Sequence, residues 1–185
     1  RFEYLYKLVS RDRYNAADRL ANRDLLDHGT LYVARFAGDG SGEWRALRHG
    51  DRGLAGADGF ASQADVLVRT RMAADALGAT KMDRPEWVAV HPRTKEVYCA
   101  LTNSALRGGA GQLAPDGANP RANNVMGQII RWKEAGDFDS ASFQWNHLVL
   151  AGDPANERPE AKGNIVGDLF ACPDGLALDA RGVLW

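Results

Sequence analysis

The fold is decided by a pattern that the sequence contains twice, as PEWVAV at residues 85–90 and as PDGLAL at residues 173–178. Each copy opens with proline and a carboxylate, continues as an apolar-Ala-apolar run, and is followed by a polar turn and a second apolar run. Because proline fixes φ and has no amide donor, it suits the first position of a strand or an edge strand. Glu86 and Asp174 therefore lie where two strands begin, and their equivalent positions predict one shared site.

Two further stretches predict β-hairpins. Residues 29–36 lead through a turn of Gly and Asp into residues 43–47, and residues 127–132 lead in the same way into residues 143–150. Runs rich in apolar and β-forming residues around such turns are typical of hairpins. A unit of four strands that occurs twice along the chain indicates the blades of a β-propeller. We therefore predict an all-β fold of the β-propeller class, with a β-sandwich as the alternative.

The composition fits a globular domain, with 45% hydrophobic and 25% charged residues in a chain of 185. A net charge of −1 provides no basic surface for nucleic acid or an anionic membrane. No apolar run approaches the roughly 18 residues that a membrane span needs. Strand-like sequence continues up to Trp185, and two blades alone would leave open faces. We therefore expect residues 1–185 to form a single partial propeller domain, about two blades, from inside a longer chain.

The segments between these strands are of two kinds. Residues 63–79 carry apolar residues at helical spacing, with Ser62 as N-cap and Gly78 at the end, and predict a helical insertion. A second, shorter helix is expected around residues 16–26, where the charges alternate in sign. Residues 103–126 instead form a long loop rich in glycine and asparagine, and so long a loop is usually functional or disordered.

A charged cluster directly precedes the first proline-carboxylate strand and contains Lys81, Asp83, Arg84 and Glu86. It reads either as a solvated loop with an internal ion pair or as a clamp for an oxyanion. In the second case the planar fork of Arg84 binds a phosphate or carboxylate, and a metal at Glu86 neutralises the remaining charge.

Asparagines in and beside the long loop supply neutral oxygens that calcium accepts together with carboxylates. Turn formation explains the same residues without a ligand. They are Asn103, Asn119, Asn123 and Asn124. Cys99 and Cys172 are expected to be free thiols rather than a disulfide or metal ligands.

Several blocks resemble the PhoX-type alkaline phosphatases. The most specific are RPEW at residues 84–87 and NPRANN at residues 119–124, and residues 22–26, 29–36 and 173–176 match as well. The resemblance implies a six-bladed propeller that hydrolyses phosphomonoesters at a cluster of iron (Fe³⁺) and calcium (Ca²⁺) ions on the propeller axis. It also implies a monomer that is exported by the twin-arginine route to the periplasm or outside the cell.

The same resemblance assigns roles to particular residues. Glu86 becomes a metal ligand, Asp174 a second metal-binding carboxylate, and Arg84 the arginine that holds the substrate phosphate. Three asparagines are weaker matches as contacts to metal or substrate: Asn103, Asn123 and Asn124. The family draws further ligands, including a cysteine, from other blades, so we expect only part of the site here and no or very weak phosphatase activity from the 185 residues alone.

Two alternatives remain open. One is a structural or binding propeller whose axial calcium joins its blades, and the other is a calcium-dependent lactonase of propeller fold. Neither needs an arginine beside a metal ligand, so Arg84 discriminates between them and a phosphatase. The expected partners of a phosphatase are small phosphomonoesters, with no role for nucleic acid or a membrane.

Overall fold

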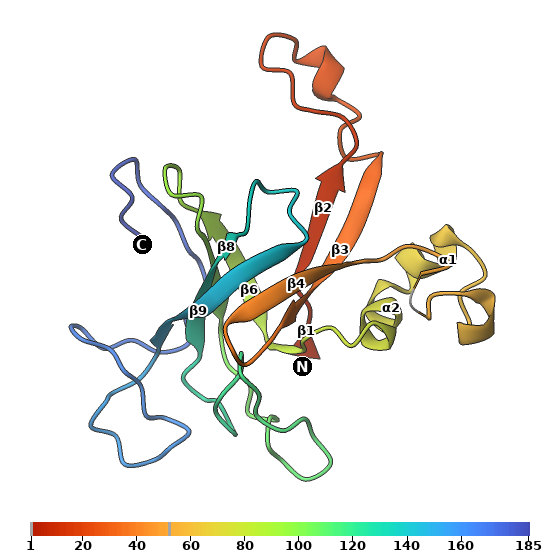
Figure 1. Cartoon of the computed structure of the whole chain (residues 1–185). Coiled ribbons are helices and arrows are strands. Elements are labelled where there is room, and N and C mark those ends of the chain that lie inside the picture. The colour runs from red at the N-terminus through yellow and green to blue at the C-terminus, as the bar shows by residue number, and fades with distance from the viewer. Residues whose placement is uncertain (1, 52) are drawn as a thin grey trace.

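The centre of the fold is one curled antiparallel sheet of seven strands (Figure 1). The structure is a computed structural model that describes residues 2–51 and 53–185. Along the sheet the order is β2-β3-β4-β9-β8-β7-β6, and each neighbouring pair is antiparallel. The strands are β2 (Tyr6–Ser10), β3 (Gly29–Phe36), β4 (Ser41–Ala46), β6 (Pro85–Val90), β7 (Val97–Leu101), β8 (Gln128–Glu134) and β9 (Ser142–Leu150). A separate two-stranded sheet pairs β1 (Phe2–Glu3) with β5 (Met82–Asp83).

Strands β6 to β9 form a four-stranded meander, which is the arrangement of a propeller blade. β6 lies at the edge of the sheet, where Pro85 needs no donor for a further ladder hydrogen bond. β7 lies between β6 and β8 and is buried at every residue. The strands predicted from residue 85 onward and within residues 127–150 are therefore confirmed.

The hairpin predicted at residues 29–47 is also confirmed, as β3 and β4, but the sequence does not predict which strands lie beside it. β2 pairs with β3 along its whole length, although the apolar run that contains it opens without a strand start signal. On the other side, β4 pairs with β9 over a short ladder that places Gly42 opposite Phe143. A Cβ on Gly42 would lie 2.0 Å from the Phe143 ring, so this crossing requires glycine.

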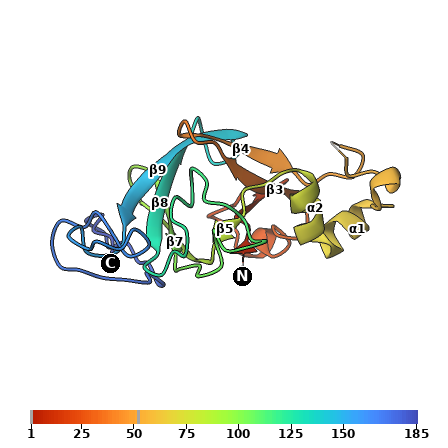
Figure 2. The same cartoon turned by 90° about the horizontal axis from the view of Figure 1, so that it is seen from below.

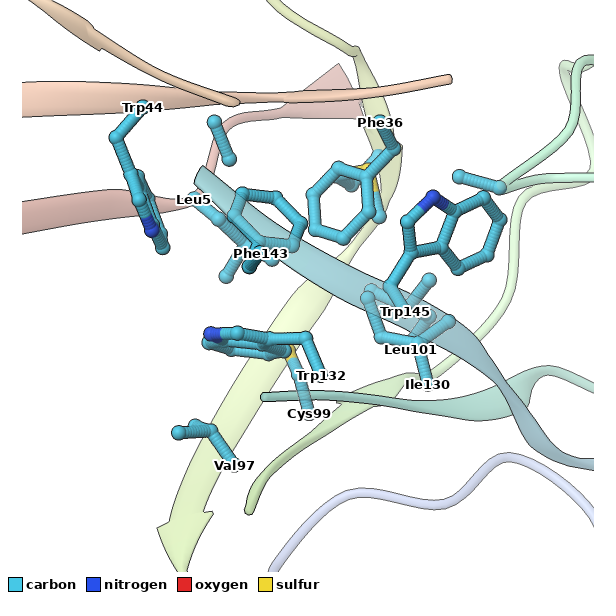
Figure 3. Packing of buried hydrophobic residues seen from close by; sticks show 13 residues of the cluster. Leu5, Phe36, Trp44, Val97, Cys99, Leu101, Ile130, Trp132, Phe143 and Trp145 are labelled. Carbon is cyan, nitrogen blue, oxygen red and sulfur yellow. The ribbon is translucent and has the colours of Figure 1, made fainter. Parts of the chain in front are cut away.

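The main core lies where the β3–β4 hairpin meets β8 and β9 (Figure 3). Its centre is a group of five aromatic side chains: Phe36, Trp44, Trp132, Phe143 and Trp145. The ring centroids of Phe36 and Phe143 are 5.1 Å apart in an edge-to-face arrangement. Such pairs contribute about 0.5–1.5 kcal/mol beyond the burial of their area. Packing of these rings therefore joins the two groups of strands that the short β4–β9 ladder connects.

The helical insertion is in the predicted place, but it is not one continuous helix. It consists of α1 (Gln63–Val68) and α2 (Thr70–Ala76), separated at Arg69, whose φ of −104° and ψ of 38° are not helical. The expected cap is confirmed, because Ser62 Oγ accepts from the amide of Asp65 (3.2 Å). Gly78 follows the end of α2 with a φ of +64°.

Two contacts stabilise the break between α1 and α2. The Thr70 hydroxyl donates to the carbonyl of Leu67, which competes with the helical ladder. The Arg69 guanidinium lies 4.9 Å from the ring centroid of Phe60, a core residue outside the helices. The local pattern predicts the helical spacing correctly, and these contacts divide the helix.

The helix expected around residues 16–26 is wrong. Only a single 3₁₀ turn forms there, η1 (Leu20–Asn22), and it buries no residue. Asn15 Oδ1 accepts from the amide of Ala17 (2.9 Å), and Asp18 Oδ1 accepts from that of Leu20 (2.9 Å). These side chains satisfy amides that a helix would use, and no packing offsets them. A second 3₁₀ turn, η2 (Gly56–Asp58), precedes α1.

The second proline-carboxylate copy forms less regular structure than the first. Ala177 and Trp185 exchange two backbone hydrogen bonds (2.9 and 2.7 Å), and Leu178 forms an isolated bridge with Leu184. The described residues of this segment therefore make a hairpin-like pair but no assigned strand. In Figure 2 this segment and the two helices lie at opposite ends of the molecule. Among the described residues, no helix has the length and apolar character of a membrane span.

Candidate functional site

Three segments meet where β6 begins. The Thr102 hydroxyl, just after β7, donates to the carbonyl of Pro173 (2.9 Å). Its neighbour Asn103 donates from Nδ2 to Cys172 Sγ (3.4 Å) and accepts at Oδ1 from Arg84 Nη1 (3.1 Å). The structure therefore brings residues 84–86, the end of β7 and the loop at residues 172–174 together. Asp174 is exposed and directly follows the docked proline.

Arg84 is held by its neighbours but keeps donors free. Its Nη2 donates to Glu86 Oε1 (3.0 Å), and its Nη1 donates to Asn103. A guanidinium carries five N–H groups, and no described residue accepts from the remaining three. The side chain is 44% exposed, so these donors are open to a ligand from solution.

Glu86 lies at an irregularity in the β6–β7 ladder. The register shifts between Pro85 and Trp87, which leaves Glu86 out of the regular pairing. Bulges of this kind re-aim side chains and occur often beside active sites. Burial of Cys99 on β7, with a further contribution from the Glu86 charge, raises the pKa of that thiol to about 12.

Backbone strain gathers in the same region. Of the four non-glycine residues with positive φ in the described chain, Arg84 (+50°) and Cys172 (+51°) lie in this cluster, and Asn123 (+46°) lies in the long loop. The two residues of the cluster are each held by a backbone hydrogen bond: the Arg84 carbonyl accepts from Thr102 N (3.1 Å), and Cys172 N donates to Met126 O (2.6 Å). Strain that is over-determined in this way is characteristic of functional sites.

A buried ion pair supports the site from behind. Arg107 Nε donates to Asp83 Oδ1 (2.7 Å), and both side chains are fully buried. Arg107 Nη2 donates to the carbonyl of Lys81 (2.6 Å), and Nη1 reaches Asp116 (3.1 Å). Burial raises the pKa of Asp83, which the Arg107 charge partly opposes. Because Asp83 directly precedes Arg84, this network fixes the chain from which the arginine projects.

Most residues of the NPRANN block help to hold this buried network and the long loop in place. Asn124 is fully buried, where Nδ2 donates to Asp83 Oδ2 (3.1 Å) and to Gln128 Oε1 (2.6 Å). Asn119 Oδ1 accepts from the amide of Asp83 (3.0 Å). The Arg121 guanidinium donates to the carbonyls of Ala151 (2.8 Å), Lys162 (3.1 Å) and Gly127. These residues hold the long loop against the sheet.

The predicted site residues therefore separate into two groups. Arg84, Glu86 and Asn103 are in contact, with Asp174 close by through Pro173. Within the described chain, no hydrogen bond joins Asn123 or Asn124 to that cluster. Their role as metal or substrate contacts stays a prediction. Sequence reasoning missed Arg107, because an arginine before a run of glycines reads as a solvated loop residue.

The donors in this cluster suit hard metal ions but are few. Carboxylate and amide oxygens are the ligands that calcium and trivalent iron prefer. Glu86 Oε1 and Asn103 Oδ1 are engaged by Arg84, which leaves Glu86 Oε2 and the Asp174 carboxylate. No group of three or more His, Cys, Asp or Glu residues that could hold a metal occurs among the described residues. Calcium takes six to eight oxygens, so these two carboxylates fit part of a metal site.

The family model for alkaline phosphatase PhoX matches residues 1–185, the whole chain. The chain belongs to the PhoX family. Among solved structures, it is similar to "Pseudomonas fluorescens PhoX in complex with vanadate, a transition state analogue", with 48% sequence identity and a TM-score of 0.94. That match covers 100% of this chain and 34% of the other, so the chain spans about a third of the length of the related protein. No curated protein matches the sequence.

Membership of the PhoX family confirms the resemblance seen in the sequence, and the all-β propeller class is confirmed with it. The extent of the domain and the number of blades stay predictions, as do the roles of the individual site residues.

Proposed function

We propose that this protein is a metal-dependent phosphomonoesterase in which Arg84 binds the phosphate of the substrate. Family membership and similarity to a phosphatase that binds vanadate support the reaction class. The observation that carries the proposal is the state of Arg84: strained, anchored at two nitrogens, and open at three N–H groups.

Arg84 has the chemistry that a phosphate dianion requires. Its planar fork can donate two parallel hydrogen bonds to phosphoryl oxygens, and it keeps its charge at alkaline pH. Anchoring by Glu86 and Asn103 removes the rotamer freedom that binding would otherwise have to restrict. A donor that is already oriented stabilises the charge developing on those oxygens in the transition state.

Glu86 and Asp174 are the residues that would hold metal ions, together with ligands from elsewhere in the protein. Ions bound there supply Lewis acidity toward the phosphoryl oxygens. We propose Ca²⁺ and Fe³⁺, both hard ions that match these oxygen donors. Glu86 then has two tasks, because one of its oxygens orients Arg84 and the other is available as a ligand.

We also propose the substrates, the oligomeric state and the location of the enzyme. Small phosphomonoesters are the substrates, the protein acts as a monomer, and it works in the periplasm or outside the cell. Support for these points comes from the family alone.

The test compares variants of the full-length protein in hydrolysis of p-nitrophenyl phosphate and in metal content. We expect Glu86→Gln to lose metal and activity together, since it removes the charge and keeps the size. Arg84→Ala should keep its metal and lose kcat/KM by about 10²–10³, the effect of removing one preorganised transition-state contact.

A matched control is Arg131→Ala. Arg131 is 38% exposed, donates from Nε to Asn146 Oδ1 (2.9 Å) and lies 3.9 Å from Glu96, so it repeats the environment of Arg84 away from the cluster. Its removal should leave turnover unchanged. Near-normal turnover by Arg84→Ala would reject the phosphate clamp and favour a structural calcium propeller. Cleavage of a lactone that exceeds cleavage of the phosphate ester would favour a lactonase.

A further inference from the structure

A directed chain of hydrogen bonds runs from Arg84 into the loop at residues 172–174. Arg84 Nη1 donates to Asn103 Oδ1 (3.1 Å), Asn103 Nδ2 donates to Cys172 Sγ (3.4 Å), and Cys172 Sγ donates to the carbonyl of Val125 (3.3 Å). Asn103 and Cys172 each accept from the residue before them in this series and donate to the one after. Such chains polarise their members and strengthen one another.

The ends of this chain fix the orientation of the Asn103 amide. Arginine has donors only, so Asn103 must present its oxygen to Arg84. The thiol gives its single hydrogen to the Val125 carbonyl and is left to accept from Asn103 Nδ2. A reversed amide would set donor against donor at Arg84 and leave the sulfur without its partner. The orientation therefore follows from the chemistry of both neighbours.

The residues on either side of Asn103 in this series are also held through their backbone. Arg84 and Cys172 are both in the left-handed region, with φ of +50° and +51°, and each is tied by a backbone hydrogen bond. Asn103 lies between them, directly after Thr102, which binds Pro173. A side chain that spans two strained, anchored residues is suited to transmit position rather than to adapt to a ligand.

We propose that Asn103 is a positioning residue that orients the Arg84 guanidinium, and that Cys172 fixes the amide of Asn103. Both act through Arg84 rather than on metal or substrate. This inference rests on the proposed phosphatase function, and it differs from a role of Asn103 as a ligand, since its amide oxygen is already engaged by Arg84.

The test is a double-mutant cycle in the full-length protein, with p-nitrophenyl phosphate hydrolysis and inhibition by inorganic phosphate as readouts. Asn103→Ala should lower kcat/KM and weaken phosphate inhibition by about tenfold, as expected for loss of one hydrogen bond to a charged group. Metal content should not change. In the Arg84→Ala background, Asn103→Ala should not lower kcat/KM further, because the guanidinium that Asn103 orients is absent.

Cysteine variants test the second step without touching the asparagine. Cys172→Ala should lower kcat/KM about threefold, and Cys172→Ser, which still donates and accepts, should restore most of it. Cys172 is exposed, so neither change is expected to unfold the protein. Asn146→Ala, which removes the partner of Arg131, is the matched control and should leave turnover unchanged.

Two results would overturn the proposal. One is additivity of Asn103→Ala and Arg84→Ala, and the other is a loss of metal in Asn103→Ala, since both would mean that Asn103 acts independently. If Asn103→Ala does not fold, an effect of Cys172→Ala that persists without Arg84 would overturn it equally. Absence of phosphatase activity in the wild-type protein would instead reject the proposed function, and this inference with it.

Discussion

Replacement of Arg107 by methionine should destabilise the protein strongly. Met keeps part of the volume but leaves the carboxylate of Asp83 buried without its charge partner. Both side chains are fully buried, and the guanidinium also binds Lys81, Ala114 and Asp116. Removing one member of a buried ion pair costs about 3–5 kcal/mol. We expect a loss of that size in the free energy of unfolding.

The assay is urea unfolding followed by intrinsic tryptophan fluorescence, with Arg158→Met as the matched control. Arg158 also pairs with a carboxylate, Glu160 at 2.8 Å, but its side chain is 67% exposed, so its loss should leave the midpoint unchanged. Combining Arg107→Met with Asp83→Asn should recover part of the loss, because no uncompensated charge remains. A cost below about 1 kcal/mol for Arg107→Met would refute the reasoning.

The dependence on pH gives a second, independent check. Burial already raises the folded-state pKa of Asp83, so protonation is favoured more in the folded than in the unfolded state. Without Arg107 this pKa rises further. The variant is therefore most stable, relative to wild type, below the pKa that Asp83 has in the unfolded state. It loses that stability as the pH rises through the pKa that Asp83 has in the folded state. The difference in stability between the two proteins should therefore shrink as the pH falls through the folded-state pKa of Asp83 in the variant.

Three other predictions concern the thiols, the crossing of the strands and the isolated chain. Iodoacetamide at pH 8 should label the exposed Cys172 in the native protein, but should label Cys99, whose pKa is raised to about 12, only after denaturation. Mass spectrometry detects both products, and rapid labelling of Cys99 in the native protein would contradict its burial. Gly42→Ala should lower the free energy of unfolding in urea by about 1–3 kcal/mol, because its Cβ overpacks against Phe143, whereas Gly38→Ala, whose Cβ meets nothing within 4 Å, should leave it unchanged. Equal effects of the two changes would argue against the close approach of Gly42 to Phe143. The 185 residues alone, supplied with calcium and iron, should not hydrolyse p-nitrophenyl phosphate above background, because two carboxylates are too few for a complete metal site; robust turnover would show that the site is complete within this chain.

Local chemistry in the sequence accounts for the elements that were predicted correctly. Pro85 marks an edge strand because an edge needs no donor, and β6 lies at the edge. Ser62 and Gly78 mark the ends of the helical insertion through capping. The Arg84–Glu86 contact follows from their spacing of two at a strand start, and it is present at 3.0 Å.

What the sequence does not predict depends on distant partners. The β4–β9 pairing joins residues about a hundred positions apart, and such a ladder leaves no local signal. Left-handed backbone at Arg84 and Cys172 is equally hidden, because neither residue type favours it. The second proline-carboxylate copy has the same pattern of residue types as the first but pairs only through Leu178 and its neighbours. A repeated motif therefore predicts position better than it predicts regular pairing.

Stability and the proposed catalysis meet at two consecutive residues. Asp83 points into the protein and binds Arg107, whereas Arg84 points outward and binds Glu86 and Asn103. The positive φ of Arg84 turns the chain between these two environments, and the carbonyl of that residue accepts from Thr102 N, at the end of β7. A change in the buried pair must therefore displace the guanidinium as well. At temperatures where Arg107→Met remains folded, its kcat/KM should fall while its metal content stays that of the wild type, which separates loss of position from loss of ligands.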